Sequence, residues 1–236
     1  MGSQNSAERG RGQRLAGATM KAMHIDDVLD RAHVVSLPLA VRFRGITTRE
    51  ALLIDGPAGW GEFAPFLEYG PAESAAWLRA GLEAAYEGFP EPVRDSIEVN
   101  ATIPAVPASE VPAVVERYPG CRTFKIKVAE KGHTLADDAA RVRAVRDAVT
   151  QRGDIPILRV DANGGWTVDE AVEAAQMMMP LDYMEQPCAT TEELAQVRGR
   201  LMRAGLFVRV AADESIRKVA DPYRVAELQA ADVAVV

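Results

Sequence analysis

The chain has 236 residues, of which 48% are hydrophobic and 26% are charged, and its formal net charge is -7. This composition is typical of a soluble globular protein with one large domain or two smaller ones. The acidic balance argues against a nucleic-acid surface, which needs a basic patch, and no apolar run approaches the ~20 residues of a membrane span. The two cysteines, Cys121 and Cys188, are too few for a disulfide framework and indicate reduced thiols in the cytoplasm.

Residues 1–22 differ in composition from the rest of the chain. They are rich in glycine, serine, alanine and arginine, and they lack the apolar run of a secretory signal. We therefore predict a disordered leader, with Met20 and Met23 as alternative starting residues.

Residues 23–95 predict a small α+β domain. The β-rich runs are residues 32–43 and 51–56, which residues 44–50 separate. The glycines at positions 59–61 indicate a tight turn after the second run. These signals predict a strand, a turn and a second strand.

A helix is expected after these strands. Pro71 suits the first turn of a helix, and small or apolar residues follow it at helical spacing. Residues 90–95, with two prolines among charged residues, form the predicted junction to a second domain. The first domain is therefore a strand layer followed by one helix.

Residues 96–236 repeat a β/α unit. Candidate strands begin near Ile97, Thr123, Ile157, Asp182, Phe207 and Asp232. Thr134, Thr167 and Asp221 are start signals for helices between them. Alternating strands and helices predict a parallel sheet, and the regular spacing favours a modified TIM-type (β/α) barrel.

The number of strands is too small for a closed barrel. Six strands can be counted, whereas a complete (β/α)8 barrel has eight and needs roughly 250 residues. We therefore expect a barrel truncated after about six strands, in a fragment of a longer protein. The alternative is an incomplete sheet, which would leave two unpaired strand edges.

Three acids close predicted strands: Asp161, Glu185 and Asp213. The carboxyl ends of parallel strands meet at one edge of a barrel, so these side chains are expected to converge. Oxygen ligands without histidine or thiolate favour a hard divalent cation, Mg²⁺ first and Mn²⁺ second. A single such acid could instead cap the following helix, but three at equivalent positions favour a metal site.

Two lysines, Lys125 and Lys127, lie on an earlier strand of the same sheet. Strand alternation places both on one face, where an amine would face the metal. Alone, they would be ordinary solvated lysines, but their place in the ordered series favours chemistry. Arg159 precedes Asp161 by two residues and is expected to share its face and to orient a carboxylate or the base.

The order of these motifs resembles the enolase superfamily, in the branch of the muconate lactonizing enzymes. The motifs are KxK at residues 125–127, DAN at 161–163, EQP at 185–187 and DES at 213–215. Further runs look like the o-succinylbenzoate synthases of actinobacterial type. They are residues 41–47, 59–71, 121–130 and 185–190.

This resemblance implies a capping α+β domain over a modified barrel with one magnesium ion. The implied activity is that of a lyase, which dehydrates 2-succinyl-6-hydroxy-2,4-cyclohexadiene-1-carboxylate to 2-succinylbenzoate in menaquinone synthesis. The substrate class is therefore a small-molecule carboxylate, with no nucleic acid or membrane partner, and the oligomeric state is left open.

The resemblance also assigns roles to single residues. Lys127 matches the acid/base of the family, Lys125 is expected to tune its charge, and Asn163 to hold a ligand or a substrate oxygen. Cap residues expected near the substrate are Gly45, Ile46, Glu62 and Phe63. The family has a second lysine at the end of the sixth barrel strand, which this chain does not include. We therefore expect these 236 residues alone to be poorly active.

Two other functions remain open at the level of sequence. The first is racemisation of N-acylamino acids or epimerisation of dipeptides, which uses the same metal with lysines on both faces of the substrate. The second is an inactive truncated chain that binds a metal or a partner through its exposed strand edges.

Overall fold

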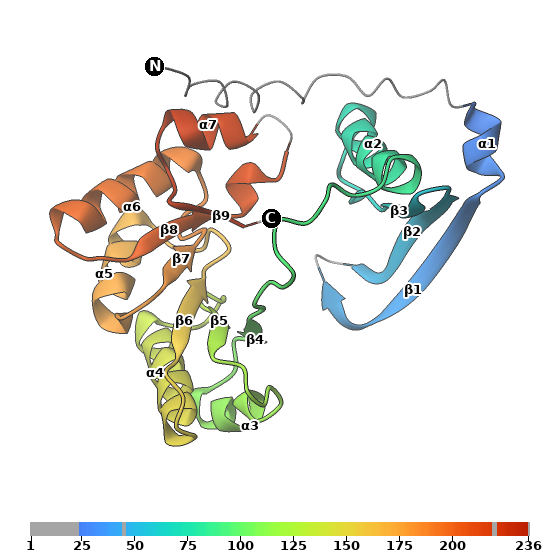
Figure 1. Cartoon of the computed structure of the whole chain (residues 1–236). Helices are drawn as coiled ribbons and strands as arrows, with labels where there is room; N and C mark the ends of the chain where they lie inside the picture. Colours follow the sequence, from blue (N-terminus) through green and yellow to red (C-terminus); the bar gives the residue numbers. More distant parts are fainter. Residues whose placement is uncertain (1–23, 44–45, 219–220, 236) are drawn as a thin grey trace, which may run out of the picture. The chain divides into compact units, whose positions relative to one another are not determined.

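The computed structural model describes residues 24–43, 46–218 and 221–235. The predicted leader and Gly45 lie outside these described residues. The chain divides into two compact units, one ending at Glu91 and the other beginning at Pro92, and each is considered by itself (Figure 1). Within the described ranges, no helix has the length and apolar character needed to cross a membrane.

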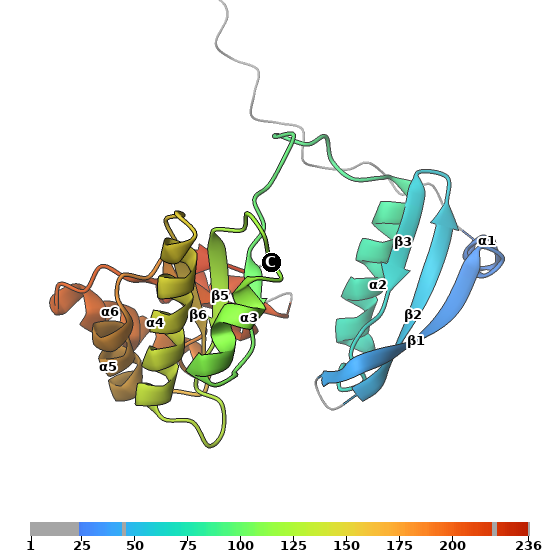
Figure 2. The same cartoon turned by 90° about the horizontal axis from the view of Figure 1, so that it is seen from below.

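The first unit is an antiparallel sheet with one long helix on it. Its elements are α1 (Ile25–Leu29), β1 (Ala32–Phe43), β2 (Ile46–Gly56), β3 (Gly59–Phe63) and α2 (Pro71–Tyr86). The three strands pair in the order β1-β2-β3. Figure 2 shows α2 lying along one face of this sheet. The predicted helix from Pro71 is confirmed.

Small residues set the close approach of α2 to β3. A Cβ atom on Gly61 would lie 1.9 Å from the main-chain oxygen of Gly81, and a Cβ on Gly81 would lie 2.5 Å from that of Glu62. Glycine at both positions lets the backbones meet, and this contact buries Ile54 and Ala85 completely.

Two details of the predicted hairpins are wrong. Residues 46–50 were expected to separate two strands but form the first half of β2, where they pair with β1. Because most of these side chains are polar, hydrophobicity did not reveal the strand, which forms through pairing with β1. Residues 59–61 were expected to form the turn but begin β3, and the turn itself is residues 57–58, between the paired Gly56 and Gly59.

The second unit is a parallel sheet with helices between its strands. Its strands are β4 (Ala101–Ile103), β5 (Thr123–Lys127), β6 (Ile157–Asp161), β7 (Tyr183–Glu185), β8 (Arg209–Ala212) and β9 (Val233–Ala234). Its helices are η1 (Ala108–Glu110), α3 (Val111–Val115), α4 (Leu135–Gln151), α5 (Val168–Met178), α6 (Thr191–Arg203), η2 (Glu214–Ile216) and α7 (Asp221–Glu227). Among the described residues, six strands pair in chain order, as a partial barrel requires.

The two faces of this sheet have opposite character. Alternate strand residues are apolar and buried against the helices. Two of these helices, α5 and α6, lie on one side of the strands in Figure 1. The buried strand residues include Phe124, Ile126, Val160, Met184 and Val210. The residues between them carry charge and point to the other face. They include Lys125, Lys127, Arg159, Asp161 and Glu185.

Capping boxes start three of the helices. Those at Thr134 and Thr167 were predicted and are confirmed, because each threonine accepts a hydrogen bond from the main-chain nitrogen three residues on. A third, at Thr190 with Glu193, has the same sequence signal but was not predicted. The boxes fix where each helix begins after its strand.

The first strand of the second unit is shorter than predicted. It was expected to begin near Ile97, but β4 begins at Ala101, opposite Phe124 of β5. Ile97 and Val99 are 76% and 80% exposed. Their β propensity is real, but no neighbouring strand pairs with them in the described residues, so they form no strand.

Candidate active site

Three of the predicted site residues lie at one level of the parallel sheet. Lys127, Asp161 and Glu185 are the last residues of β5, β6 and β7. The strand register pairs Lys127 with Asp161 and Asp161 with Glu185. The predicted convergence of strand ends is therefore present for these residues.

Two amines and two carboxylates form direct ion pairs at this level. Lys127 Nζ lies 2.6 Å from Asp161 Oδ2, and Lys125 Nζ lies 3.1 Å from the same oxygen. Lys125 Nζ also lies 2.8 Å from Glu185 Oε1. The two acids are almost completely buried, so the lysines supply the positive charge that these carboxylates need.

Burial and charge shift the pKa values of these groups in different directions. Burial opposes ionisation of Asp161, but the hydrogen bond and charge of Lys127, aided by Lys125, lower its pKa below the ordinary value. Burial raises the pKa of Glu185 to about 7. The hydrogen bond from Lys125 lowers this pKa, and the negative charge of Asp161 raises it further. Burial also acts against the Lys125 ammonium, yet Glu185 and Asp161 outweigh it and raise its pKa.

Asp213 lies just after the end of β8, at the start of η2. Ala211 of β8 pairs with Glu185, so Asp213 follows two residues beyond this level. Its main-chain nitrogen donates to Gln186 Oε1 at 3.1 Å. Burial, followed by the charge of Glu214, raises the pKa of the Asp213 carboxyl. Across the described ranges, no three His, Cys, Asp or Glu side chains are grouped closely enough to hold a metal.

The chemistry of this cluster nevertheless fits a hard divalent cation. The Oε2 atom of Glu185 is buried and has no hydrogen-bond partner, so one carboxylate oxygen lacks the positive charge or donor that burial demands. All the acidic ligands are oxygens, the type that Mg²⁺ prefers. Asp161 and Glu185 are therefore the core of a candidate cation site, and Asp213 is the third acid at its edge.

Asn163 connects Lys127 to the neighbouring loop. Its Oδ1 accepts a hydrogen bond from Lys127 Nζ at 2.8 Å, and its Nδ2 donates to Glu214 Oε1 at 3.2 Å. Its main-chain nitrogen donates to Asp161 Oδ1. Its φ of 46° is in the left-handed region, which asparagine tolerates better than most residues. Asn163 thus orients the lysine.

Gln186 is a residue that sequence reasoning missed. Its side chain is completely buried, and its Oε1 accepts hydrogen bonds from the main-chain nitrogens of Asp213 and Ser215. Its Nε2 donates to Ser215 Oγ and to the carbonyl oxygen of Cys188. The sequence signal that could have identified it is an amide side chain directly after Glu185, the acid that ends β7. Gln186 fixes the loop that carries Asp213.

Arg159 lies on the same face but contacts other partners. Its Nε lies 2.9 Å from Asp182 Oδ2, and its Nη1 donates to Asn100 Oδ1 at 2.9 Å. The guanidinium also covers the ring of Tyr183. Arg159 therefore contacts none of the three acids at the strand ends, and its pairing partner Asp182 was not predicted.

The predicted cap residues lie in the first unit. Ile46 begins β2, Glu62 is exposed in β3, and Phe63 is half-buried at its end. Their role near a substrate stays a prediction.

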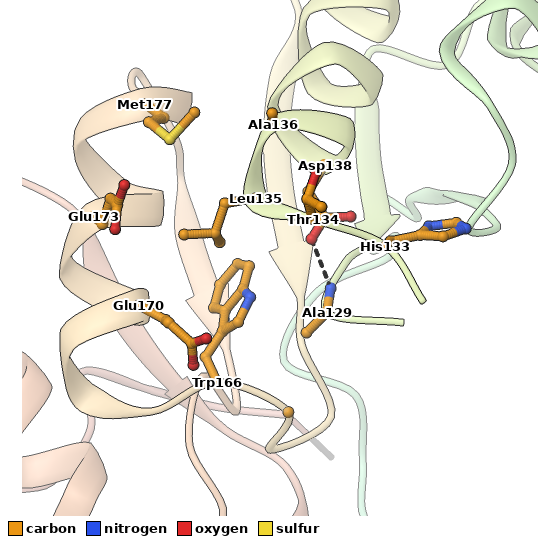
Figure 3. Close-up of a pocket in the computed structure, with 11 residues that line it drawn as sticks. Ala129, His133, Thr134, Leu135, Ala136, Asp138, Trp166, Glu170, Glu173 and Met177 are labelled. Carbon is orange, nitrogen blue, oxygen red and sulfur yellow. Dashed lines mark hydrogen bonds between the residues drawn. The ribbon is translucent and has the colours of Figure 1, made fainter. Parts of the chain in front are cut away.

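The second unit also contains a cleft on the helix side of the sheet. It has a volume of about 490 Å³ and lies between the start of α4 and α5. Figure 3 shows Trp166 below Leu135, with Glu170 and Met177 from α5 on the opposite wall. None of the predicted site residues lines it, so this cleft is separate from the cluster of acids and lysines.

Comparison with curated proteins shows extensive sequence similarity. The chain is 59% identical over 214 residues to an o-succinylbenzoate synthase of Mycolicibacterium smegmatis, a match that covers 89% of this chain and 63% of that protein. It is 58% identical to the corresponding Mycobacterium leprae protein, covering 89% and 61%. The chain thus spans about three fifths of the length of these relatives.

Solved structures share the fold. An L-Ala-D/L-Glu epimerase from Bacillus subtilis matches with a TM-score of 0.65 at 24% identity, over 86% of this chain and 72% of that one. A mandelate racemase/muconate lactonizing protein from Herpetosiphon aurantiacus matches with a TM-score of 0.63 at 26% identity and the same coverage. An enolase superfamily member from Roseovarius nubinhibens, complexed with magnesium, matches with a TM-score of 0.62 at 18% identity, over 86% and 69%.

Family comparison divides the chain in the same way as its fold. Residues 34–85 match the enolase N-terminal domain-like family, and residues 108–236 match the enolase C-terminal domain-like family. The second match alone covers more than half of the chain, and the predicted fold class, a capping domain followed by a partial barrel, is confirmed. With acids and lysines in register at the strand ends, the chain belongs to the enolase superfamily.

Proposed function

We propose that this chain carries the catalytic face of an o-succinylbenzoate synthase. The reaction is the syn-dehydration of 2-succinyl-6-hydroxy-2,4-cyclohexadiene-1-carboxylate to 2-succinylbenzoate, a step of menaquinone synthesis. The observation that carries the proposal is the ion-paired cluster of Lys127, Lys125, Asp161 and Glu185 at the ends of adjacent strands. The similarity to named synthases at 55–59% identity supports the substrate.

The described side chains supply the proton transfers of this reaction. Lys127 removes the proton from the carbon next to the substrate carboxylate and returns it to the departing hydroxyl on the same face. One C–H bond and one C–O bond break, a C=C bond forms, and water leaves. Asn163 and Asp161 hold the amine of Lys127 by hydrogen bonds at 2.8 and 2.6 Å. Lys125 keeps a second positive charge beside it.

Asp161, Glu185 and Asp213 are the residues that would hold magnesium. When bound, this ion supplies positive charge to the substrate carboxylate as negative charge develops on its oxygens. The unpartnered Glu185 Oε2 supports this assignment.

The test uses a chimera, because the chain spans only about three fifths of its relatives. The chimera adds to this chain the part of the Mycolicibacterium smegmatis protein that lies outside the match. Initial rates are measured on the succinyl-cyclohexadiene acid and on N-succinyl amino acids, with Mg²⁺. We expect dehydration by the chimera, and a loss of at least ~100-fold in K127A but not in K131A, since removing a general base has effects of this size.

The outcomes separate the candidate functions. Racemisation without dehydration would favour the sister activity, and activity of K127A near that of the unmodified chimera would remove Lys127 from the mechanism. No turnover of either substrate would refute the proposed function. We expect the 236-residue chain alone to be poorly active, because open sheet edges hold side chains less accurately than a closed barrel. Full turnover by this chain would contradict that expectation.

A further inference from the structure

A buried ion pair on α4 lies directly behind the strand that carries Lys127. Arg141 Nη1 lies 2.6 Å from Asp138 Oδ1, and each of the two side chains is only 1% exposed. The Arg141 guanidinium also donates to the main-chain oxygens of Val106, at 2.6 Å, and Lys127, at 3.0 Å. Its Nη2 lies 2.7 Å from His133 Nδ1. One guanidinium therefore joins three segments around the end of β5.

The acid of the pair holds the same chain segment two residues further along. Asp138 Oδ2 accepts a hydrogen bond from the main-chain nitrogen of Ala129 at 2.8 Å, the contact drawn as a dashed line in Figure 3. Ala129 has a φ of 58°, a left-handed conformation that alanine rarely adopts. A Cβ atom on Gly165 would lie 2.9 Å from the Ala129 Cβ, so the loop after β6 also packs closely against Ala129.

The pair thus binds the carbonyl of Lys127 and the amide two residues later. Val128, between them, donates its main-chain hydrogen bond to the carbonyl of Asp161. The peptide groups that follow the lysine are therefore fixed both to α4 and to β6. The side chain of Lys127 itself is 32% exposed and has flexible single bonds, so the backbone that carries it decides where its amine can reach.

The stability of the fold alone does not explain why a charged pair, Asp138 and Arg141, is buried at this position. A buried ion pair loses hydration, and replacing both partners by apolar side chains of similar size is often neutral or stabilising. Four hydrogen bonds to fixed main-chain and side-chain atoms, by contrast, specify a conformation that an apolar pair cannot specify.

We propose that Asp138 and Arg141 are positioning residues, which fix the end of β5 so that the Lys127 amine stays at Asp161 and Asn163. The proposal deepens the proposed function, because it rests on the role of Lys127 in proton transfer. Its test requires no substrate, so the result does not depend on whether the chain dehydrates the cyclohexadiene acid.

The experiment measures how fast each lysine amine is acetylated by acetic anhydride at one fixed pH, with mass spectrometry of the peptides. The double variant D138L/R141M replaces the ion pair by an apolar pair. The matched control is R146M, because Arg146 lies on the same helix and also donates to main-chain oxygens, those of Met178 and Pro180. Exposed Lys131 is the reference amine within each sample.

We expect D138L/R141M to fold with a lower melting temperature, because the main-chain groups of Val106, Lys127 and Ala129 lose their partners. Acetylation of Lys127 in the folded variant should be faster by about tenfold, the effect of losing one charge-assisted hydrogen bond. The rate at Lys131 should not change, and R146M should leave both rates unchanged. Unchanged Lys127 acetylation in the folded double variant would overturn the proposal, as would an equal increase in R146M.

A single variant covers the case in which D138L/R141M does not fold. R141K keeps a positive charge beside Asp138, but one amine cannot reach all the partners of the guanidinium. We expect faster acetylation of Lys127 in folded R141K, by about threefold or more, because only part of the hydrogen bonding is lost. If neither variant folds while R146M does, the pair has a purely structural role and the proposal fails.

Discussion

Lowering the pH should weaken binding of Mg²⁺ to this chain, and Glu185 should account for most of the effect. Only the ionised carboxylate is a good ligand for a hard cation. The pKa of Glu185 is raised to about 7 by burial and by Asp161, so in the metal-free protein this group gains a proton as the pH falls through 7. The Asp161 pKa is lowered, so that acid stays ionised over the same range.

The size of the effect follows from the fraction of Glu185 that is ionised. With a pKa of about 7, roughly 76% is ionised at pH 7.5 and roughly 3% at pH 5.5, so the affinity for Mg²⁺ should fall by about 25-fold between them. The bound metal favours the ionised carboxylate of Glu185, whose pKa is raised. The affinity of the chain for Mg²⁺ is therefore retained above pH 7 and lost below it.

Isothermal titration calorimetry with Mg²⁺ measures both consequences of this linkage. Titrations at pH 6.5 in buffers of different ionisation enthalpy should show release of most of one proton per bound ion. In the variant E185Q the affinity should be weaker at pH 7.5 and nearly independent of pH. An affinity in the unmodified chain that is constant between pH 5.5 and 7.5, without proton release, would refute the reasoning.

Three further predictions concern the fold. Cys188 is completely buried, and burial raises its pKa to about 12. At pH 8 a thiol reagent should therefore modify half-buried Cys121 first and Cys188 only after unfolding. Rapid modification of both cysteines would contradict this prediction. T190A should lower the free energy of unfolding by about 1 kcal/mol in urea melts, since Thr190 caps α6. G61A should cost about 1–3 kcal/mol through overpacking against α2. G70A, where a Cβ would meet nothing within 4 Å, should cost less than about 1 kcal/mol, because it only replaces glycine by alanine at the N-cap of α2; equal effects would contradict the overpacking.

The sequence predicts those parts of the site that depend on the alternation of residues along each strand and on the parallel pairing of the strands. Apolar strands that end in Asp161 and Glu185 had to bring these acids together once the strands paired in parallel register, and Lys127 follows from the same register. Alternation along β5 likewise placed Lys125 on the face of Lys127.

Contacts between distant segments could not be predicted from these patterns. Asp182 pairs with Arg159, and Gln186 holds the loop of Asp213, because of where two strand ends meet in space. Ile97 has strand propensity without a neighbouring strand among the described residues. The ion pairs of Lys125 likewise depend on burial, which the residue types alone do not give.

The most direct test of the central claim is the position of the metal relative to the three acids. Crystals of the chain grown or soaked with Mn²⁺ would be measured by anomalous diffraction. We predict one anomalous peak with an oxygen of Asp161, Glu185 and Asp213 each at about 2.0–2.4 Å, and with Lys127 Nζ on the open side of the ion. A peak that contacts fewer than two of these acids, or no peak at saturating Mn²⁺, would contradict the account.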